Sequence, residues 1–145
     1  MTEGRGERGS TWEAVRGAVR SWAASRPDVQ ALGLAGSRAR NAAGPDSDAD
    51  LVVVTDVPDD YLGASWARHA LPDEAVDIGT RRWGVLLERR FRLTGGLEVE
   101  FGFVDARWAA EPLDPGTIRV VGDGFVVLYD PRGLLERLVE LVGRG

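Results

Sequence analysis

The chain has 145 residues, of which 43% are hydrophobic and 28% charged, and it carries a net charge of −5. This composition is typical of one globular domain with a core of its own, and the acidic balance is unfavourable for binding extended nucleic acid. The chain has no cysteine, which excludes disulfides and thiolate metal sites and favours a cytoplasmic location. No apolar run approaches the length of a membrane span. Residues 1–9 are polar and rich in glycine, which predicts a disordered tail in front of a single domain over residues 10–145.

The first part of this domain is predicted to form one helix and two strands. Ser10-Thr11-Trp12-Glu13 has the spacing of a capping box, so a helix should follow to about Ser25. Apolar runs bounded by Gly, Pro and Asp predict buried strands over residues 29–35 and 49–55. The core face of the helix is expected to consist of the apolar residues that recur at helical intervals, which are Trp12, Val15, Val19 and Trp22.

The middle of the chain predicts a helix and a hairpin. Residues 61–71 are expected to be helical, with Pro72 ending the helix, and the single histidine, His69, is interpreted as structural because one imidazole cannot make a zinc site. Residues 83–93 and 97–104 flank a short glycine-rich connection, which is typical of a hairpin.

The last part of the chain predicts a second hairpin and a final helix. Residues 118–121 and 125–129 flank Gly122-Asp123-Gly124, another hairpin signal. Asp130-Pro131 supplies an N-cap and a proline at the first helical position, so a helix is expected to run to about Val142.

Two acidic residues open the second predicted strand. Because side chains alternate along a strand, Asp48 and Asp50 should project from the same face. Two carboxylates beside a buried strand repel each other, and Mg²⁺ prefers one or two protein carboxylates together with substrate phosphates. The pair therefore predicts a magnesium site, whereas Asp46 lies in the preceding turn, over residues 41–47, and is interpreted as a turn former.

Gly36-Ser37, at the end of the first predicted strand, has the character of a phosphate site. Glycine lets the backbone come close to a ligand, N–H groups at a turn entering a helix bind anions, and the serine hydroxyl adds a donor. A short helix is expected to follow and to carry Arg38 and Arg40. The 18 lysine and arginine residues are all arginine, which excludes a Walker lysine and leaves guanidinium groups and backbone N–H groups to contact phosphate.

An acidic strand face is predicted later in the chain. Residues 97–103 alternate apolar side chains with Glu98, Glu100 and a glycine, so one face is apolar and the other acidic. Arg90 and Arg92 of the preceding arm could lie opposite these acids. Taken alone, Glu98 and Glu100 are explained by cross-strand ion pairs.

The order of these motifs resembles a known family. Gly36-Ser37, ten intervening residues and then Asp48-Ala49-Asp50-Leu51 is similar to the signature of the DNA polymerase beta superfamily. Gly-Ser-Arg-Ala-Arg followed by Ser-Asp-Ala-Asp-Leu resembles, more closely, its small bacterial members, the minimal nucleotidyltransferases. Asn41 stands where these proteins usually have glycine, and asparagine also tolerates left-handed backbone angles.

The resemblance implies a fold and a set of site residues. The fold would be α/β (α+β), a mixed β-sheet flanked by helices, as in polymerase-beta-like nucleotidyltransferases. Asp48 and Asp50 would be catalytic and would hold two Mg²⁺ ions, and the family's third carboxylate, which lies on a later strand, would be Glu100, with Glu98 as the alternative. The nucleoside triphosphate would be bound by Gly36, Ser37, Arg38 and Arg40.

The same resemblance implies a function with two alternatives. The chain would transfer a nucleoside monophosphate, in the first instance AMP from ATP, to a protein or small-molecule acceptor. Family members of this size also act as antitoxins beside a small helical toxin of the HEPN type, with or without catalysis. A third interpretation is a small-molecule modifier similar to antibiotic nucleotidyltransferases, in which a homodimer would supply the missing helical domain. The sequence leaves the acceptor, the base and the oligomeric state open.

Overall fold

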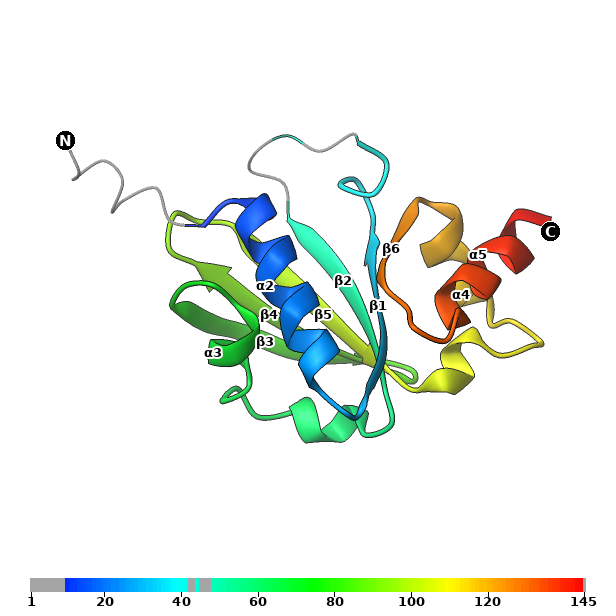
Figure 1. Ribbon diagram of the computed structural model, residues 1–145, viewed down its shortest axis with the longest axis horizontal. Helices are drawn as coiled ribbons and strands as arrows, with labels where there is room; N and C mark the ends of the chain where they lie inside the picture. Colours follow the sequence, from blue (N-terminus) through cyan, green and yellow to red (C-terminus); the bar gives the residue numbers. More distant parts are fainter. Residues whose placement is uncertain (1–9, 42–43, 45–47, 145) are drawn as a thin grey trace.

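The computed structural model describes residues 10–41, 44 and 48–144, which are built around one β-sheet (Figure 1). The predicted tail of residues 1–9 and most of the predicted turn before the second strand, with Asp46, lie outside the described residues. None of the helices in the described part of the chain combines the length and the apolar character that crossing a membrane requires.

The sheet has six strands in the order β3-β4-β5-β2-β1-β6. Neighbouring strands run antiparallel except β2 and β5, which are parallel. This mixed sheet with flanking helices confirms the predicted fold class. The strands are β1 (Val29–Ala35), β2 (Ala49–Thr55), β3 (Ala75–Trp83), β4 (Leu86–Leu93), β5 (Glu98–Val104) and β6 (Phe125–Tyr129).

Helices cover the two faces of the sheet, each over its own hydrophobic core. On one face, α2 (Trp12–Ser25) buries Trp22 among the aromatic side chains of β5. On the other face, α4 (Pro115–Gly122) and α5 (Leu134–Arg144) lie beside β1 and β6, as Figure 1 shows, and α5 buries Leu138. On β2 and β5 this second core contains Val52, Val54 and Val104, whereas the acidic side chains lie nearer the start of both strands.

Several predicted elements are confirmed at or near their expected bounds. The first helix begins at Trp12, and its N-cap is Thr11 rather than Ser10, because the Thr11 hydroxyl accepts the N–H of Ala14 at 3.2 Å. Strands β1 and β2 have the predicted bounds, and β4 and β5 form the predicted hairpin. The last helix begins at Leu134, later than expected.

The prediction for residues 61–71 was wrong for most of its length. This region contains a 3₁₀ helix, η1 (Pro58–Tyr61), and a four-residue helix, α3 (Ala67–Ala70). Strand β3, which follows, was not predicted, because it is an edge strand with mostly exposed residues and so lacks the alternation that marks a half-buried strand.

The predicted hairpin near the C-terminus was also wrong in its first arm. Residues 118–121 belong to α4, whose N-cap Asp114 accepts the N–H of Gly116 at 3.3 Å and which has Pro115 in its first turn. These N-terminal signals outweigh the β-branched run that suggested a strand. The second arm, β6, is formed but pairs with β1. The helix expected after Ser37 is a turn.

Candidate active site

The predicted carboxylates come from neighbouring strands. In the parallel pair of β2 and β5, Asp50 lies directly opposite Glu100, and in the antiparallel pair of β4 and β5, Glu100 lies opposite Arg90. Residues in register on paired strands project from the same face of a sheet. Asp50, Glu100 and Arg90 therefore form a row across three strands, on the face opposite α2.

The turn after β1 packs against this row. Ala35 is the register partner of Asp50, and Gly36 follows it with a backbone φ of +77°. A Cβ on Gly36 would lie 2.7 Å from Oδ2 of Asp50, so only glycine lets the backbone approach the carboxylate this closely. The carbonyl of Gly36 accepts the N–H groups of Ala39 and Arg40 at 3.1 and 3.2 Å, which closes the turn that Ser37 opens. The predicted phosphate segment thus lies directly beside the predicted metal pair.

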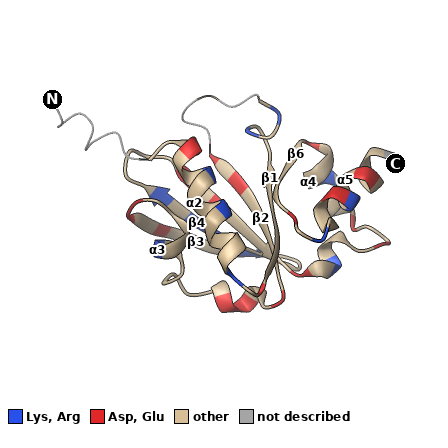
Figure 2. Ribbon diagram, in the orientation of Figure 1, with Lys and Arg blue, Asp and Glu red and all other residues tan. Residues whose placement is uncertain are grey.

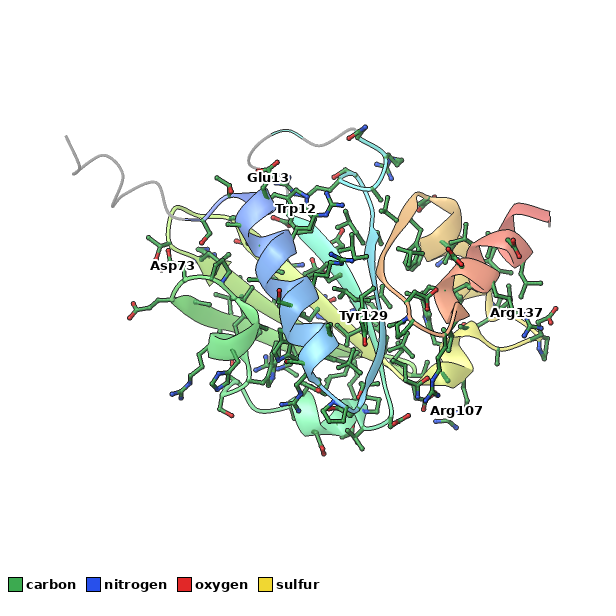
Figure 3. The ribbon with its side chains drawn as sticks, in the orientation of Figure 1. Trp12, Glu13, Asp73, Arg107, Tyr129 and Arg137 are labelled. Atoms are coloured by element: carbon green, nitrogen blue, oxygen red, sulfur yellow. The ribbon has the colours of Figure 1, made fainter. Side chains whose placement is uncertain are left out.

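The two arginines of this turn point in different directions. Nη1 of Arg40 donates to the carbonyl oxygen of Asp123 at 2.7 Å, and Arg40 lines the cavity above the carboxylates. The guanidinium of Arg38 lies 5.6 Å from the ring centroid of Trp12, at the N-terminal end of α2 on the other side of the sheet (Figure 3). Arg38 is not among the cavity-lining residues. Of the two, Arg40 is the one adjacent to the carboxylates.

Asn41 ends the turn with a φ of +61°. This left-handed conformation agrees with the expectation that asparagine tolerates such angles at this position. Asparagine is the residue other than glycine that adopts these angles most readily.

Arg90 lies among four carboxylates. Its guanidinium nitrogens are 3.1 Å from Glu98, 3.7 Å from Asp48 and 4.0 Å from Glu88, and Nη2 donates to Oε2 of Glu100. The cross-strand ion pairs considered from the sequence are therefore present. Figure 2 marks both acidic and basic positions on the strands of the sheet.

The pKa of Glu100 is shifted upward, whereas that of Glu98 is shifted downward. Burial, together with the charges of Asp50 and Glu88, raises the pKa of Glu100 to about 7. Burial and the charge of Asp48 also raise the pKa of Asp50. By contrast, hydrogen bonds from arginine, that of Arg92 first, hold the pKa of Glu98 below its ordinary value. Asp50 and Glu100 thus lie where additional positive charge would be favourable, and Glu98 does not.

A cavity of about 770 Å³ opens over this row. Its acidic end is formed by Asp50 and Glu100, with Gly36 and Arg40 alongside. One wall is formed by Trp83, the last residue of β3, and by the turn that follows it, and another by helix α4. Arg107, labelled in Figure 3, is another lining residue. A volume of this size is in the usual range for small-molecule and cofactor sites. The sequence did not reveal the walls, because β3 and α4 were not predicted.

The expected magnesium ions require oxygen donors that lie close together. Within the described residues, no three or more His, Cys, Asp or Glu side chains are gathered closely enough to hold a metal ion. The guanidinium of Arg90 lies between Asp48 and Glu100 and contacts both. The chemistry of the donors fits Mg²⁺ nonetheless, since they are hard carboxylate oxygens, two of them from directly opposed residues, with an excess of negative charge.

Comparison with known proteins agrees with the geometry. The profile of the nucleotidyltransferase domain family matches residues 15–104, a segment that contains Gly36, Ser37, Asp48, Asp50 and Glu100. No curated protein gives a significant match. The chain therefore belongs to the nucleotidyltransferase domain family of the DNA polymerase beta superfamily, and it is a nucleotidyltransferase.

Proposed function

We propose that the chain transfers a nucleoside monophosphate, in the first instance AMP from ATP, to an acceptor hydroxyl or another nucleophile. The observation that carries this proposal is the register of β2 and β5, in which Asp50 and Glu100 lie opposite each other at one end of a cavity of about 770 Å³. Because Gly36 abuts Asp50, a triphosphate bound at the turn would lie against the carboxylates.

Each residue has a role in this proposal. Asp48, Asp50 and Glu100 would hold two magnesium ions, which when bound stabilise the attacking and leaving oxygens of an in-line displacement. Backbone N–H groups near Ser37, with Arg40, would bind the β- and γ-phosphates. The acceptor oxygen would form a bond to the α-phosphorus as the bond to pyrophosphate breaks, and the acceptor's proton would pass to Glu100.

The two ends of the cavity suit different parts of a nucleotide, the charged phosphates and the planar base. Its acidic end suits the metal-bound phosphates, whereas Leu86 and Trp83, on the hairpin wall, supply apolar surface. Trp83 is 56% exposed, and its indole N–H donates to Glu88 at 2.9 Å. The ring is thus held at the cavity wall, available to a base or an acceptor.

The test is transfer of labelled nucleotide by carboxylate variants. Incubation with each labelled triphosphate, Mg²⁺ and cell lysate, followed by location of the label, identifies base and acceptor. The double variant Asp48→Asn, Asp50→Asn should lose both Mg²⁺-dependent triphosphate binding and transfer, and full activity would refute the assignment.

A matched pair of variants tests the third carboxylate. Glu100→Gln should abolish transfer, whereas Glu98→Gln, two residues away on the same face of β5, should retain it. The opposite result would transfer the assignment to Glu98.

A protein acceptor or partner is the second candidate. Trp83, the last residue of β3, and Val85, in the turn that follows, are 56% and 60% exposed and line the cavity. Exposed apolar residues beside a site favour contact with another protein, for which a helical toxin of the HEPN type is the candidate. Copurification with such a toxin that persists in the double aspartate variant would indicate binding without catalysis, and label on the toxin would indicate modification.

A further inference from the structure

Arg90 lies among the carboxylates that are the predicted metal ligands. It lies on β4 directly opposite Glu100, which lies in turn opposite Asp50 on β2. Nη1 of Arg90 is 3.7 Å from Oδ2 of Asp48, and Nη2 donates to Oε2 of Glu100. One guanidinium therefore links two of the three carboxylates that a shared cation would use.

Acidic neighbours stabilise the positive charge of Arg90. Burial opposes its protonation, but Glu100, Glu98, Glu88 and Asp48 together raise its pKa above the ordinary value. Its side chain is 32% exposed, so these interactions are only partly screened by solvent.

A guanidinium and a divalent cation compete for these carboxylates. Mg²⁺ binds oxygen at about 2.0–2.1 Å with near-octahedral geometry, whereas Asp48 and Glu100 contact the guanidinium group of Arg90. The two positive charges also repel each other. For Asp48 and Glu100 to turn toward a shared cation, Arg90 has to withdraw, and Glu88 and Glu98 remain within its reach.

We propose that Arg90 is a positioning residue that acts as the internal counter-ion of the site, holding Asp48 and Glu100 in the metal-free chain and giving way when a divalent cation binds. This inference rests on the proposed function. It predicts that Arg90 lowers the metal affinity of the free protein while stabilising the metal-free fold.

Arg92 supplies a matched control. It lies two residues away on the same strand and face, its side chain is 51% exposed, and it bonds to Glu98 at 3.1 Å. If both arginines only neutralise the acidic face of the sheet, replacing either one should affect metal binding alike. If Arg90 competes with the cation, only its replacement should tighten binding.

The experiment is titration of the full chain with Mn²⁺, without nucleotide, followed by calorimetry and by electron paramagnetic resonance. Arg90→Gln should bind Mn²⁺ about tenfold more tightly than the wild type, which corresponds to about 1.4 kcal/mol, and Arg92→Gln should stay within about twofold. The metal-free Arg90→Gln variant should also melt at a lower temperature and gain more from Mn²⁺ than the wild type. Unchanged or weaker Mn²⁺ binding by Arg90→Gln would overturn the assignment.

Two further variants keep the outcome interpretable. If Arg90→Gln does not fold, Arg90→Lys keeps the charge but cannot fork between two carboxylates, so it should tighten Mn²⁺ binding by a smaller factor; no tightening overturns the proposal. Asp50→Asn reports on the site itself. Absence of Asp50-dependent Mn²⁺ binding in both the wild type and Arg90→Gln would overturn the proposed function and this inference with it. Asp50-dependent binding that Arg90→Gln fails to tighten would overturn this inference alone.

Discussion

Replacing Gly36 by alanine should strain the backbone and also displace the carboxylate of Asp50. Gly36 has a φ of +77°, where a non-glycine residue costs about 1–2 kcal/mol. The added Cβ would also lie 2.7 Å from Oδ2 of Asp50, well inside van der Waals contact, so the carboxylate or the end of β1 must shift. A displacement of about 1 Å in a catalytic constellation can cost about 100-fold in rate. We therefore expect Gly36→Ala to lose about 1–2 kcal/mol of unfolding free energy in urea and about 100-fold in labelled-nucleotide transfer.

Gly133→Ala is the control for that experiment. Gly133 has a similar φ of +71°, but a Cβ there would meet no heavy atom within 4 Å. This variant should lose a similar unfolding free energy and keep the transfer rate. The reasoning is refuted if Gly36→Ala transfers nucleotide at the wild-type rate, or if Gly133→Ala loses as much activity.

The remaining predictions concern stability. Arg89 is 1% exposed and donates to the carbonyls of Tyr61 and Gly79, among other acceptors, so Arg89→Met should cost about 3 kcal/mol in urea unfolding because buried acceptors lose their donors. Arg82→Met removes only an exposed ion pair and should cost less than about 1 kcal/mol; equal losses would contradict the argument. Burial opposes ionisation of Asp28, but the hydrogen bonds it accepts, that from Tyr61 first, hold its pKa below 3.8. Its contribution to stability is therefore fully present above pH 3.8 and is lost as the pH falls through the lowered pKa. Asp28→Asn should flatten the acid limb of a plot of unfolding free energy against pH, and an unchanged slope in that variant would count against this assignment.

The sequence was most informative for strands that are buried on both faces. Strands β1 and β2 are short apolar runs between turn residues, and their predicted bounds agree with the structure. Periodicity alone could not reveal β3, whose residues are mostly exposed, nor distinguish the β-branched run of α4 from a strand. The signals that define α4, Asp114 and Pro115, are present in the sequence, but the hairpin signal of Gly122-Asp123-Gly124 favoured a strand before it.

For the candidate site, the sequence could predict which residues take part but not how they are arranged in space. The spacing of Asp48 and Asp50 is local and can be read directly, whereas the pairing of Asp50 with Glu100 depends on the register of two parallel strands that are about 50 residues apart in the chain. Arg90 could be expected to face the acids of its hairpin partner. Its contact with Asp48, by contrast, follows from the strand order β4-β5-β2, which hydrophobic patterns do not encode.

The family profile ends at residue 104, yet the turn beside Asp50 is tethered by later residues. The N–H of Gly36 donates to the carbonyl of Gly124 at 3.3 Å, and Arg40 reaches the carbonyl of Asp123 at 2.7 Å. The residues after the profile boundary therefore help to hold the turn after β1 in place beside Asp50. A fragment that ends at the profile boundary would lose β6, which pairs with β1 next to this turn. It would also lose the helices whose apolar residues pack on one face of the sheet.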